Sequence, residues 1–284
     1  VAKEWLSAYQ YTEWLLREPQ KAIQRSLLRE LLKGVSVDKH SMRERLSDAS
    51  LDADWRVAII AMSSNPTAEH NQSEVLSVLE SRLRAFCDEC FLLDELGLNI
   101  FICLFKKDIE ERAVLHNLIQ TVQGFFDSAK LSKASAGIGG LGRPLLEVYD
   151  TFREAARSLR VAISERADSK ILYWGNLGVD QIISIVAESI EAAQYSKNLL
   201  EPLFAFDCEH GTELVQTLLT LEDNAWNINK TALALSIHYN TVKYRMEKAL
   251  ELLNIDRENP KEQFALSLAI RMYRFGLRGI LSNS

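Results

Sequence analysis

The chain lacks long apolar runs, common catalytic motifs and a signal sequence. No apolar run approaches the roughly 20 residues that span a bilayer, and the N-terminus lacks the basic and then apolar order of a signal peptide. We therefore expect a cytoplasmic protein that does not contact a membrane. HExxH, Walker and GxSxG motifs are absent, which removes the usual sequence signs of an enzyme. Because the first residue is Val1 rather than Met, the question whether a further domain precedes it stays open.

Cysteines are also few, with four in 284 residues. Cys87 and Cys90 form a lone CxxC beside a strand-like run, where residues three apart point to opposite faces. Cys208 and His210 lie close in sequence, but nothing completes a set of four ligands. Ordinary, partly buried cysteines are the favoured interpretation, and we predict no metal and no cofactor.

Positive charge is scarce overall but concentrated in one segment. Lys and Arg number 33 against 39 Asp and Glu, giving a net charge of −6, and the 47% hydrophobic content allows one or two ordinary cores. Residues 229–248 nevertheless contain four basic residues and one acidic residue. A basic patch on an acidic chain is the pattern expected of a small surface that meets phosphate.

This segment predicts two helices joined by a tight turn. Thr231–Leu235 forms the short first helix, residues 236–238 the turn, and residues 240–253 the longer second helix. At 100° per residue the apolar positions of the second helix fall on one side. They are Val242, Met246, Ala249 and Leu253. A short helix, a turn and a basic helix form the layout of a helix-turn-helix, so we expect double-stranded DNA as a partner.

The outward side of the second helix supplies the predicted contacts. Asn240 and Tyr244 are expected to face base edges, whereas Thr241, Lys243 and Lys248 are expected to face phosphates. For Arg245, about 70° from the buried direction, an ion pair to another helix and a DNA contact both stay open. For His238, capping of the second helix and a phosphate contact stay open.

Further matches around the two helices carry a family resemblance. They are Thr231-Ala232, Leu235, His238, Asn240-Thr241 and Tyr244-Arg245, with residues 203–207, 213–218 and 266–269. The pattern resembles the C-terminal helix-turn-helix of the PucR/CdaR group of bacterial transcription regulators, although Tyr239 stands where that group usually has a basic residue. The resemblance implies a regulator that responds to a small-molecule effector. The full predicted DNA-binding set is Lys230, Thr231, His238, Tyr239, Asn240, Thr241, Lys243, Tyr244, Arg245 and Lys248.

Upstream, short apolar runs alternate with amphipathic helices. Strands are predicted at Arg56–Met62, Phe86–Leu93, Asn99–Phe105, Ala134–Ile138 and Lys170–Tyr173. Helices are predicted at Pro66–Arg84, Asp108–Phe126 and Leu145–Arg166. Helices that cover one mainly antiparallel sheet make the fold class α+β. The order of the elements resembles a degenerate GGDEF domain, the palm-like fold found in the middle of the same regulators.

The GGDEF resemblance raises a competing function, because true members of that fold make cyclic dinucleotides from GTP. That reaction needs a glycine-rich hairpin and carboxylates that hold two Mg²⁺ ions. The hairpin here reads Asp94-Glu95-Leu96-Gly97, and residues 60–65 at the end of the first strand contain no carboxylate. We predict no catalytic residues. The alternative function is a nucleotide-binding sensor or cyclase-like enzyme whose helical tail is an interaction module.

A glycine-rich run at residues 137–142 is a second place where a nucleotide could bind. It follows a strand and precedes a helix, as phosphate loops do. The other features of dinucleotide sites are missing, so a flexible strand-to-helix loop is favoured. The effector site is unknown, with Arg143 as a candidate contact.

Four parts are predicted along the chain. Residues 1–50 form an N-terminal helical segment for linkage or dimerisation, 51–178 the degenerate GGDEF-like domain, 179–207 a helical connector, and 208–284 the PucR-type helix-turn-helix domain. Because one helix-turn-helix makes few base contacts, we expect a homodimer.

Apolar periodicity assigns faces within the terminal parts. Trp5, Tyr9 and Leu16 recur at helical spacing in residues 2–17. A second helix opens at Pro19, and its face of Ile23, Leu27 and Leu31 is the expected dimer contact. Near the other end a helix opens at Asn259-Pro260. It is expected to bury Phe264, Leu268 and Tyr273, while Leu221, Ile228, Ile237 and Leu253 share one core.

Overall fold

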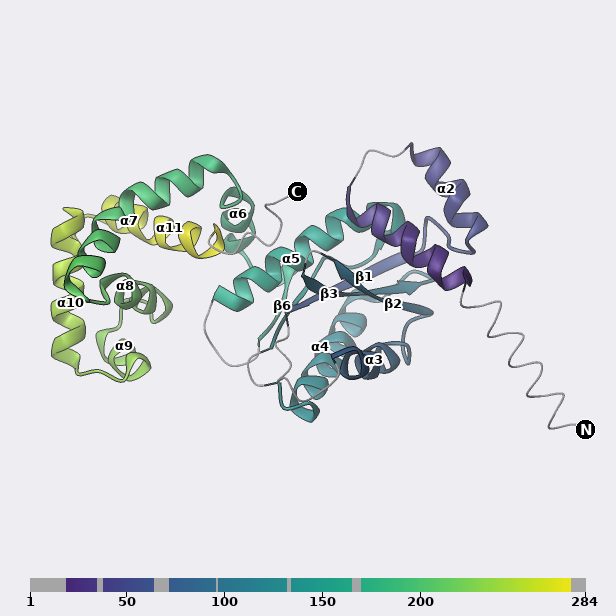
Figure 1. The fold of residues 1–284 in the computed structure, drawn as a ribbon, viewed down its shortest axis with the longest axis horizontal. Helices are drawn as coiled ribbons and strands as arrows, with labels where there is room; N and C mark the ends of the chain where they lie inside the picture. Colours follow the sequence, from purple (N-terminus) through teal and green to yellow (C-terminus); the bar gives the residue numbers. More distant parts are fainter. Residues whose placement is uncertain are drawn as a thin grey trace, which may run out of the picture. The chain divides into compact units, whose positions relative to one another are not determined.

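The computed structural model describes residues 19–34, 38–63, 72–95, 97–131, 134–164 and 170–276. It divides into two compact units between Leu177 and Gly178, and each unit is described by itself (Figure 1). Unit 1 combines helices with one sheet, and the described part of unit 2 contains helices. The α+β fold class is confirmed. The helix predicted over residues 2–17 lies outside the described residues.

The described sheet of unit 1 has six strands in the order β2-β3-β1-β4-β6, with β5 paired to β1. Their bounds are β1 Arg56–Ser63, β2 Glu89–Glu95, β3 Leu98–Phe105, β4 Ser135–Ile138, β5 Arg143–Pro144 and β6 Ile171–Tyr173. The described pairs are antiparallel except β4 with β6. The short β5 was not predicted, because two residues are too few to show a period.

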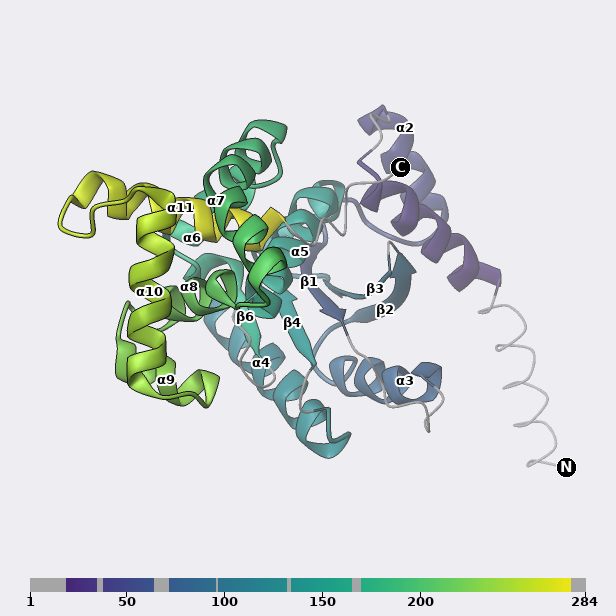
Figure 2. The ribbon, with the colours of Figure 1, turned by 60° about the vertical axis from the view of Figure 1, so that its left-hand side comes forward.

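Helices cover both faces of this sheet, which is why β1 is a nearly continuous apolar run. Helices α3 (Gln72–Leu83) and α4 (Glu111–Ser128) pack with Ala58, Ile60 and Met62 of β1 on one face (Figure 2). Helix α5 (Val148–Ser164) lies against the other face. A Cβ on Gly137 of β4 would lie 2.1 Å from the Ala155 carbonyl oxygen, so the backbones of β4 and α5 are in direct contact.

The N-terminal helices pack within unit 1. Residues 19–32 are helical, and α2 (Lys39–Asp48) follows, with the Asp38 carboxylate as its N-cap. Gln24 Nε2 donates to the Ala49 carbonyl oxygen at 2.8 Å, which joins the first helix to the end of α2. Of the expected dimer face, Leu27 is buried and Leu31 half-buried, whereas Ile23 is 56% exposed. The prediction that this face forms the dimer contact is corrected, because Leu27 and Leu31 pack within the same chain.

Unit 2 is a bundle of short and long helices around one core. They are α6 Val179–Val186, α7 Ile190–His210, α8 Leu214–Asp223, α9 Ile228–Leu235, α10 Tyr239–Leu253 and α11 Pro260–Gly276. The shared core of Leu221, Ile228, Ile237 and Leu253 is confirmed. The burial of Phe264 is wrong, since it is 68% exposed. The inward side of α11 contains Leu266 and Ile270. Phe264 lies two positions before Leu266, which places it on the opposite side of the helix.

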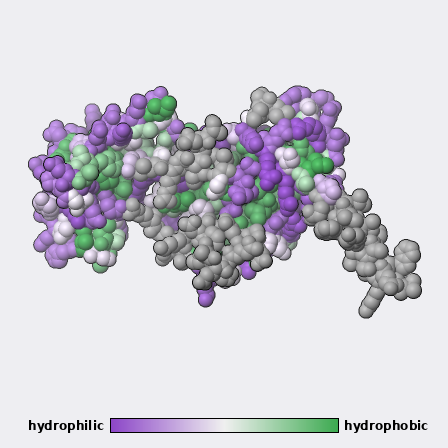
Figure 3. Space-filling view, in the orientation of Figure 1, coloured by the Kyte–Doolittle hydropathy of each residue, from purple (hydrophilic) through white to green (hydrophobic). Residues whose placement is uncertain are grey.

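The surface of unit 2 is mainly hydrophilic in the view of Figure 3, with separate hydrophobic patches between hydrophilic residues. Throughout the described ranges, every helix is too short or too polar to cross a membrane.

Candidate nucleic-acid interface

Local backbone chemistry fixes the turn between α9 and α10. The Asn227 side chain caps α9 by accepting a hydrogen bond from Lys230 N at 3.0 Å. Ser236 ends α9 in the left-handed region, with φ 55°, and Ile237 N then donates to the Ala232 carbonyl oxygen. His238 caps α10, since its Nδ1 accepts from Asn240 N at 3.2 Å. Of the two roles left open for His238, the structure shows the cap.

One side of α10 is anchored in the core of unit 2. Val242, Met246 and Ala249 are buried, and Leu253 packs against the same core. These are the four positions that the helical period placed inward, so the buried side of α10 is confirmed. Because apolar burial fixes the rotation of the helix, it also determines which side chains face outward.

The first turns of α10 present a polar surface with two tyrosines. Asn240, Thr241 and Lys243 are exposed, and Tyr244 is 64% exposed. Tyr239 lies at the start of the helix and is also exposed. The Lys243 ammonium is 3.8 Å from the Glu247 carboxylate, a solvent-exposed pair that a stronger anion can replace at little cost. The N-terminal end of a helix also favours anions through its free N–H groups and dipole.

Three residues of the predicted set are engaged within the protein. Thr231 is fully buried, and its hydroxyl donates to the Asn227 carbonyl oxygen at 2.9 Å, so its assignment to the DNA surface is corrected. Arg245 forms an ion pair with Glu213 before α8 at 3.0 Å. Lys248 lies 3.1 Å from Glu251, and its ammonium is over the Phe206 ring. The outward direction predicted for Lys248 is also corrected, because its ammonium lies over the ring of Phe206 in α7.

After these corrections the candidate interface consists of six exposed residues of α9 and α10. Its residues are Lys230, Tyr239, Asn240, Thr241, Lys243 and Tyr244. Lys230 is exposed in the first turn of α9, and the others begin α10. Two cations, hydrogen-bonding side chains and two aromatic rings suit a phosphate backbone and base edges.

Sequence reasoning missed a half-buried polar network that supports these helices. Glu222 of α8 accepts hydrogen bonds from Trp226 Nε1 at 2.8 Å and from Ser267 of α11 at 2.9 Å. Arg271 of α11 joins Glu222 to Asp180 of α6, at 3.1 and 2.7 Å. Burial lowers the pKa of Arg271, but its hydrogen bonds to these carboxylates raise it overall. The pairs lie 49 and 91 residues apart, too far for any local sequence pattern to reveal.

In unit 1, the candidate nucleotide-binding features are also occupied by the protein itself. Glu95 at the β2–β3 hairpin pairs with Arg29 at 2.7 Å. In the glycine-rich loop, Glu154 accepts from Gly140 N at 2.9 Å and from Arg143 at 2.7 Å. A carboxylate thus already lies where a phosphate would bind, and Arg143, the candidate effector contact, is neutralised by it.

Both units match known domain families. Residues 33–161 match the GGDEF-like domain, and residues 214–272 match the PucR C-terminal helix-turn-helix domain. The second match begins with α8 and extends into α11, so it includes α9, the turn and α10.

Three curated proteins of Bacillus subtilis (strain 168) are similar to the chain. The DNA-binding transcriptional activator AdeR is 26% identical over 149 residues, 52% of this chain and 35% of that protein. The purine catabolism regulatory protein is 29% identical over 140 residues, 49% of this chain and 26% of that protein. The proline-responsive transcriptional activator PutR is 23% identical over 214 residues, 73% of this chain and 52% of that protein. The alignments span from about a quarter to about half of these relatives' length.

One solved structure is similar to the chain: the regulator of polyketide synthase expression from Bifidobacterium adolescentis. The two are 16% identical with a TM-score of 0.43, and the alignment covers 89% of this chain and 98% of that one. The family assignment depends instead on the two domain matches, which occur in the order that the sequence resemblance implied. The curated relatives are regulators as well. The chain thus carries a GGDEF-like domain followed by a PucR C-terminal helix-turn-helix domain, and this combination, with regulators as its curated relatives, supports a PucR/CdaR-type regulator.

Proposed function

We propose that the protein is a DNA-binding transcription regulator whose helix α10 enters the major groove. The observation that carries this proposal is the contrast between the two sides of α10. Val242, Met246 and Ala249 fix one side in the core, while Asn240 and Tyr244 extend into solvent on the other. A large aromatic side chain left 64% exposed on a firmly packed helix suits a contact surface.

The proposed contacts divide into those with bases and those with phosphates. Asn240 is the candidate for base recognition, since an amide side chain can bind adenine through two hydrogen bonds. Tyr244, one turn later, lies beside it for a second base contact. Lys230 and Lys243 are proposed phosphate contacts, which position the helix without selecting a sequence. Arg245 is assigned to the ion pair with Glu213 rather than to DNA.

The regulator is proposed to act in the cytoplasm as a homodimer that responds to a small metabolite. Two copies of one helix-turn-helix can engage half-sites one helical turn apart, which raises both affinity and specificity. The four-part division at residues 50, 178 and 207 is retained as part of the proposal. The ion pair between Arg29 and Glu95 supports packing of the N-terminal segment against the GGDEF-like domain.

We further propose that the GGDEF-like domain has no cyclase activity. Glu95 is paired with Arg29, and Asp94 lies opposite Asn99 in the β2–β3 ladder. Among the described residues, no group of three or more acidic or histidine side chains gathers as ligands for Mg²⁺. The relatives are named as regulators, which supports the same conclusion.

The test is DNA binding by fluorescence anisotropy, with promoter DNA from the chain's own gene and unrelated DNA of equal length. Asn240→Ala should lose roughly 1–3 kcal/mol of binding free energy at the preferred site, and much less on unrelated DNA. Val242→Asp should abolish binding by unfolding the bundle, because it buries an unpaired charge. If Asn240→Ala and Tyr244→Ala, both folded, bind the preferred DNA like wild type, the proposed surface of α10 is wrong.

A further inference from the structure

Three cysteine side chains of unit 1 meet on the face of the sheet that α3 and α4 cover. Their sulfur atoms all lie within 4.8 Å of one another, and Cys90 Sγ is 3.9 Å from Cys103 Sγ. Cys90 and Cys103 lie opposite each other in the β2–β3 ladder, whereas Cys87 comes from the bend between α3 and β2. Within the described ranges, this is the single group of three or more potential metal-ligating side chains that converges in this way.

The separations between the sulfurs suit a shared metal ion. Three thiolates each about 2.3 Å from one ion lie about 3.8 to 4.0 Å apart, in tetrahedral or trigonal geometry. The Cys90–Cys103 distance already has this value. The remaining separations need to shorten by at most about 1 Å. Cys87 can supply that movement, because it is half-buried in a bend, whereas the other two are fixed in strands.

The surroundings of the cluster include one hydrogen bond from a thiol and one nearby positive charge. The Cys87 thiol donates to the Leu83 carbonyl oxygen at 3.2 Å, a bond that is lost when the thiol gives up its proton to bind metal. Arg84 is held beside the cluster by a hydrogen bond to the Cys90 carbonyl oxygen at 3.1 Å and by an ion pair with Glu80 at 2.7 Å. A positive charge in this place stabilises thiolates, the form in which cysteine binds metal.

We propose that Cys87, Cys90 and Cys103 bind one thiophilic divalent metal ion of the Zn²⁺ and Cd²⁺ class. Thiolate ligands select such soft ions. As three metal–sulfur bonds form, the three thiol protons pass to solvent, which leaves a net charge of −1 with a divalent ion and −2 with Cu⁺. Burying the larger charge costs more, so the divalent ion is favoured. Three protein ligands leave the fourth tetrahedral position open.

Ordinary packing is the competing explanation, because Cys90 and Cys103 also belong to the apolar core between the sheet, α3 and α4. Buried free cysteine behaves as a small apolar side chain. The two explanations differ in whether the sulfurs bind an ion, so the test must detect metal–sulfur bonds directly.

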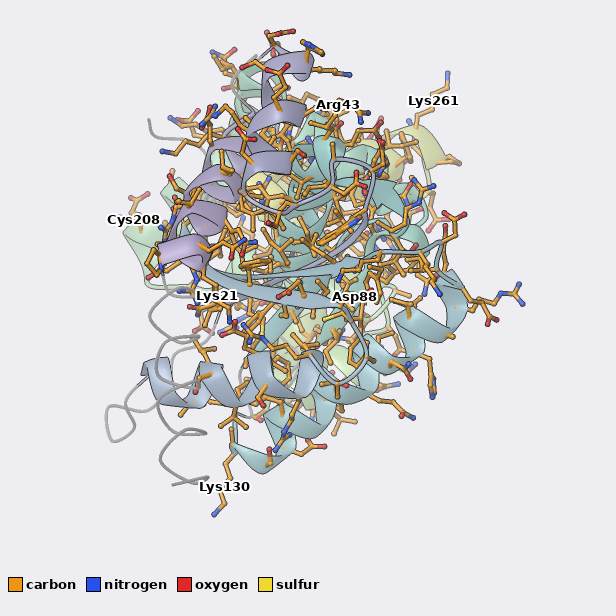
Figure 4. The ribbon with its side chains drawn as sticks, turned by 90° about the vertical axis from the view of Figure 1, so that its right-hand side faces the viewer. Lys21, Arg43, Asp88, Lys130, Cys208 and Lys261 are labelled. Atoms are coloured by element: carbon orange, nitrogen blue, oxygen red, sulfur yellow. The ribbon has the colours of Figure 1, made fainter. Side chains whose placement is uncertain are left out.

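The test is a Cd²⁺ titration of the full, reduced chain without oxygen, followed by thiolate-to-cadmium charge-transfer absorption. The band should saturate at one ion per chain, and Zn²⁺ should remove it by competition. Cys87→Ser and Cys103→Ala should each weaken binding by more than about 100-fold, above the loss typical of residues that only orient a ligand. Cys208→Ser is the matched control, since Cys208 is exposed on α7 (Figure 4), and it should bind like wild type.

Thermal unfolding of the same proteins separates ligand loss from misfolding. Cys87→Ser alters a half-buried residue, so it should unfold near the wild-type temperature without metal. Cd²⁺ should raise the Tm of wild type and Cys208→Ser, but not that of Cys87→Ser. The proposal is overturned if wild type gives no charge-transfer band, or if the band persists in both Cys87→Ser and Cys103→Ala.

Discussion

Lys243 and Lys248 provide a direct test of how α10 faces DNA, because both are lysines on one helix in different surroundings. Lys243 is about half exposed and forms a weak pair with Glu247 at 3.8 Å. Replacement by Glu removes this pair, worth about 0.3–0.5 kcal/mol, and adds a like-charge repulsion of similar size. Lys243→Glu should therefore lower the free energy of unfolding by less than about 1 kcal/mol, so any larger binding defect arises at the DNA.

The expected binding defect has a characteristic dependence on salt. Loss of one phosphate contact reduces the slope of log affinity against log salt by about 0.9. When salt rises from about 50 to about 200 mM, the advantage of wild type over Lys243→Glu should therefore shrink by about 3.5-fold. Lys248→Glu should leave the slope unchanged but lower the Tm, since Lys248 pairs with Glu251 and covers Phe206.

Anisotropy titrations at four salt concentrations, with thermal unfolding in parallel, measure both effects. Lys261→Glu supplies the control for net charge, because Lys261 is an exposed residue of α11 (Figure 4). Its slope should match wild type. Lys243 is assigned to a phosphate contact and Lys248 to packing within the protein. A change of the salt slope for Lys248→Glu as large as that for Lys243→Glu would refute this assignment.

Three further outcomes are expected. Gly137→Ala should destabilise unit 1 by at least about 1–3 kcal/mol in denaturant unfolding, since the new Cβ would lie 2.1 Å from the Ala155 carbonyl oxygen; a stability equal to wild type would contradict the close contact of β4 and α5. Arg245→Ala should lower stability by about 0.2–1 kcal/mol, as expected for a partly exposed pair with Glu213, and leave the salt slope unchanged. The full chain incubated with GTP and Mg²⁺ or Mn²⁺ should yield no cyclic dinucleotide by mass spectrometry, and product formation that Glu95→Gln abolishes would disprove the proposed inactivity.

Sequence periodicity predicted the elements whose pattern is local. The strand at Arg56–Met62 matches β1 within a residue, because its apolar run is long and bounded. The buried side of α10 was also predicted correctly from Val242, Met246 and Ala249. In both cases the period of one element determines which residues are buried, whatever its neighbours are.

Errors arose where a neighbouring element decides the outcome. The helical period placed Lys248 outward, but its ammonium lies over the ring of Phe206, which belongs to α7. Thr231 was expected at the surface, yet its hydroxyl satisfies a backbone carbonyl inside the bundle. Cys103 was not connected to the CxxC, since only the β2–β3 register brings Cys90 opposite it. Contacts of this kind depend on topology, which spacing along the chain does not contain.

The carboxylate of Glu154, a residue of α5, binds to the glycine-rich loop where an anionic ligand would bind, so the two would compete for this position. It accepts hydrogen bonds from Gly140 N and Arg143, and it is tethered on the same chain. A tethered ligand acts at an effective concentration on the order of millimolar or higher. An anion that binds this loop must therefore displace a carboxylate that is held on the same chain.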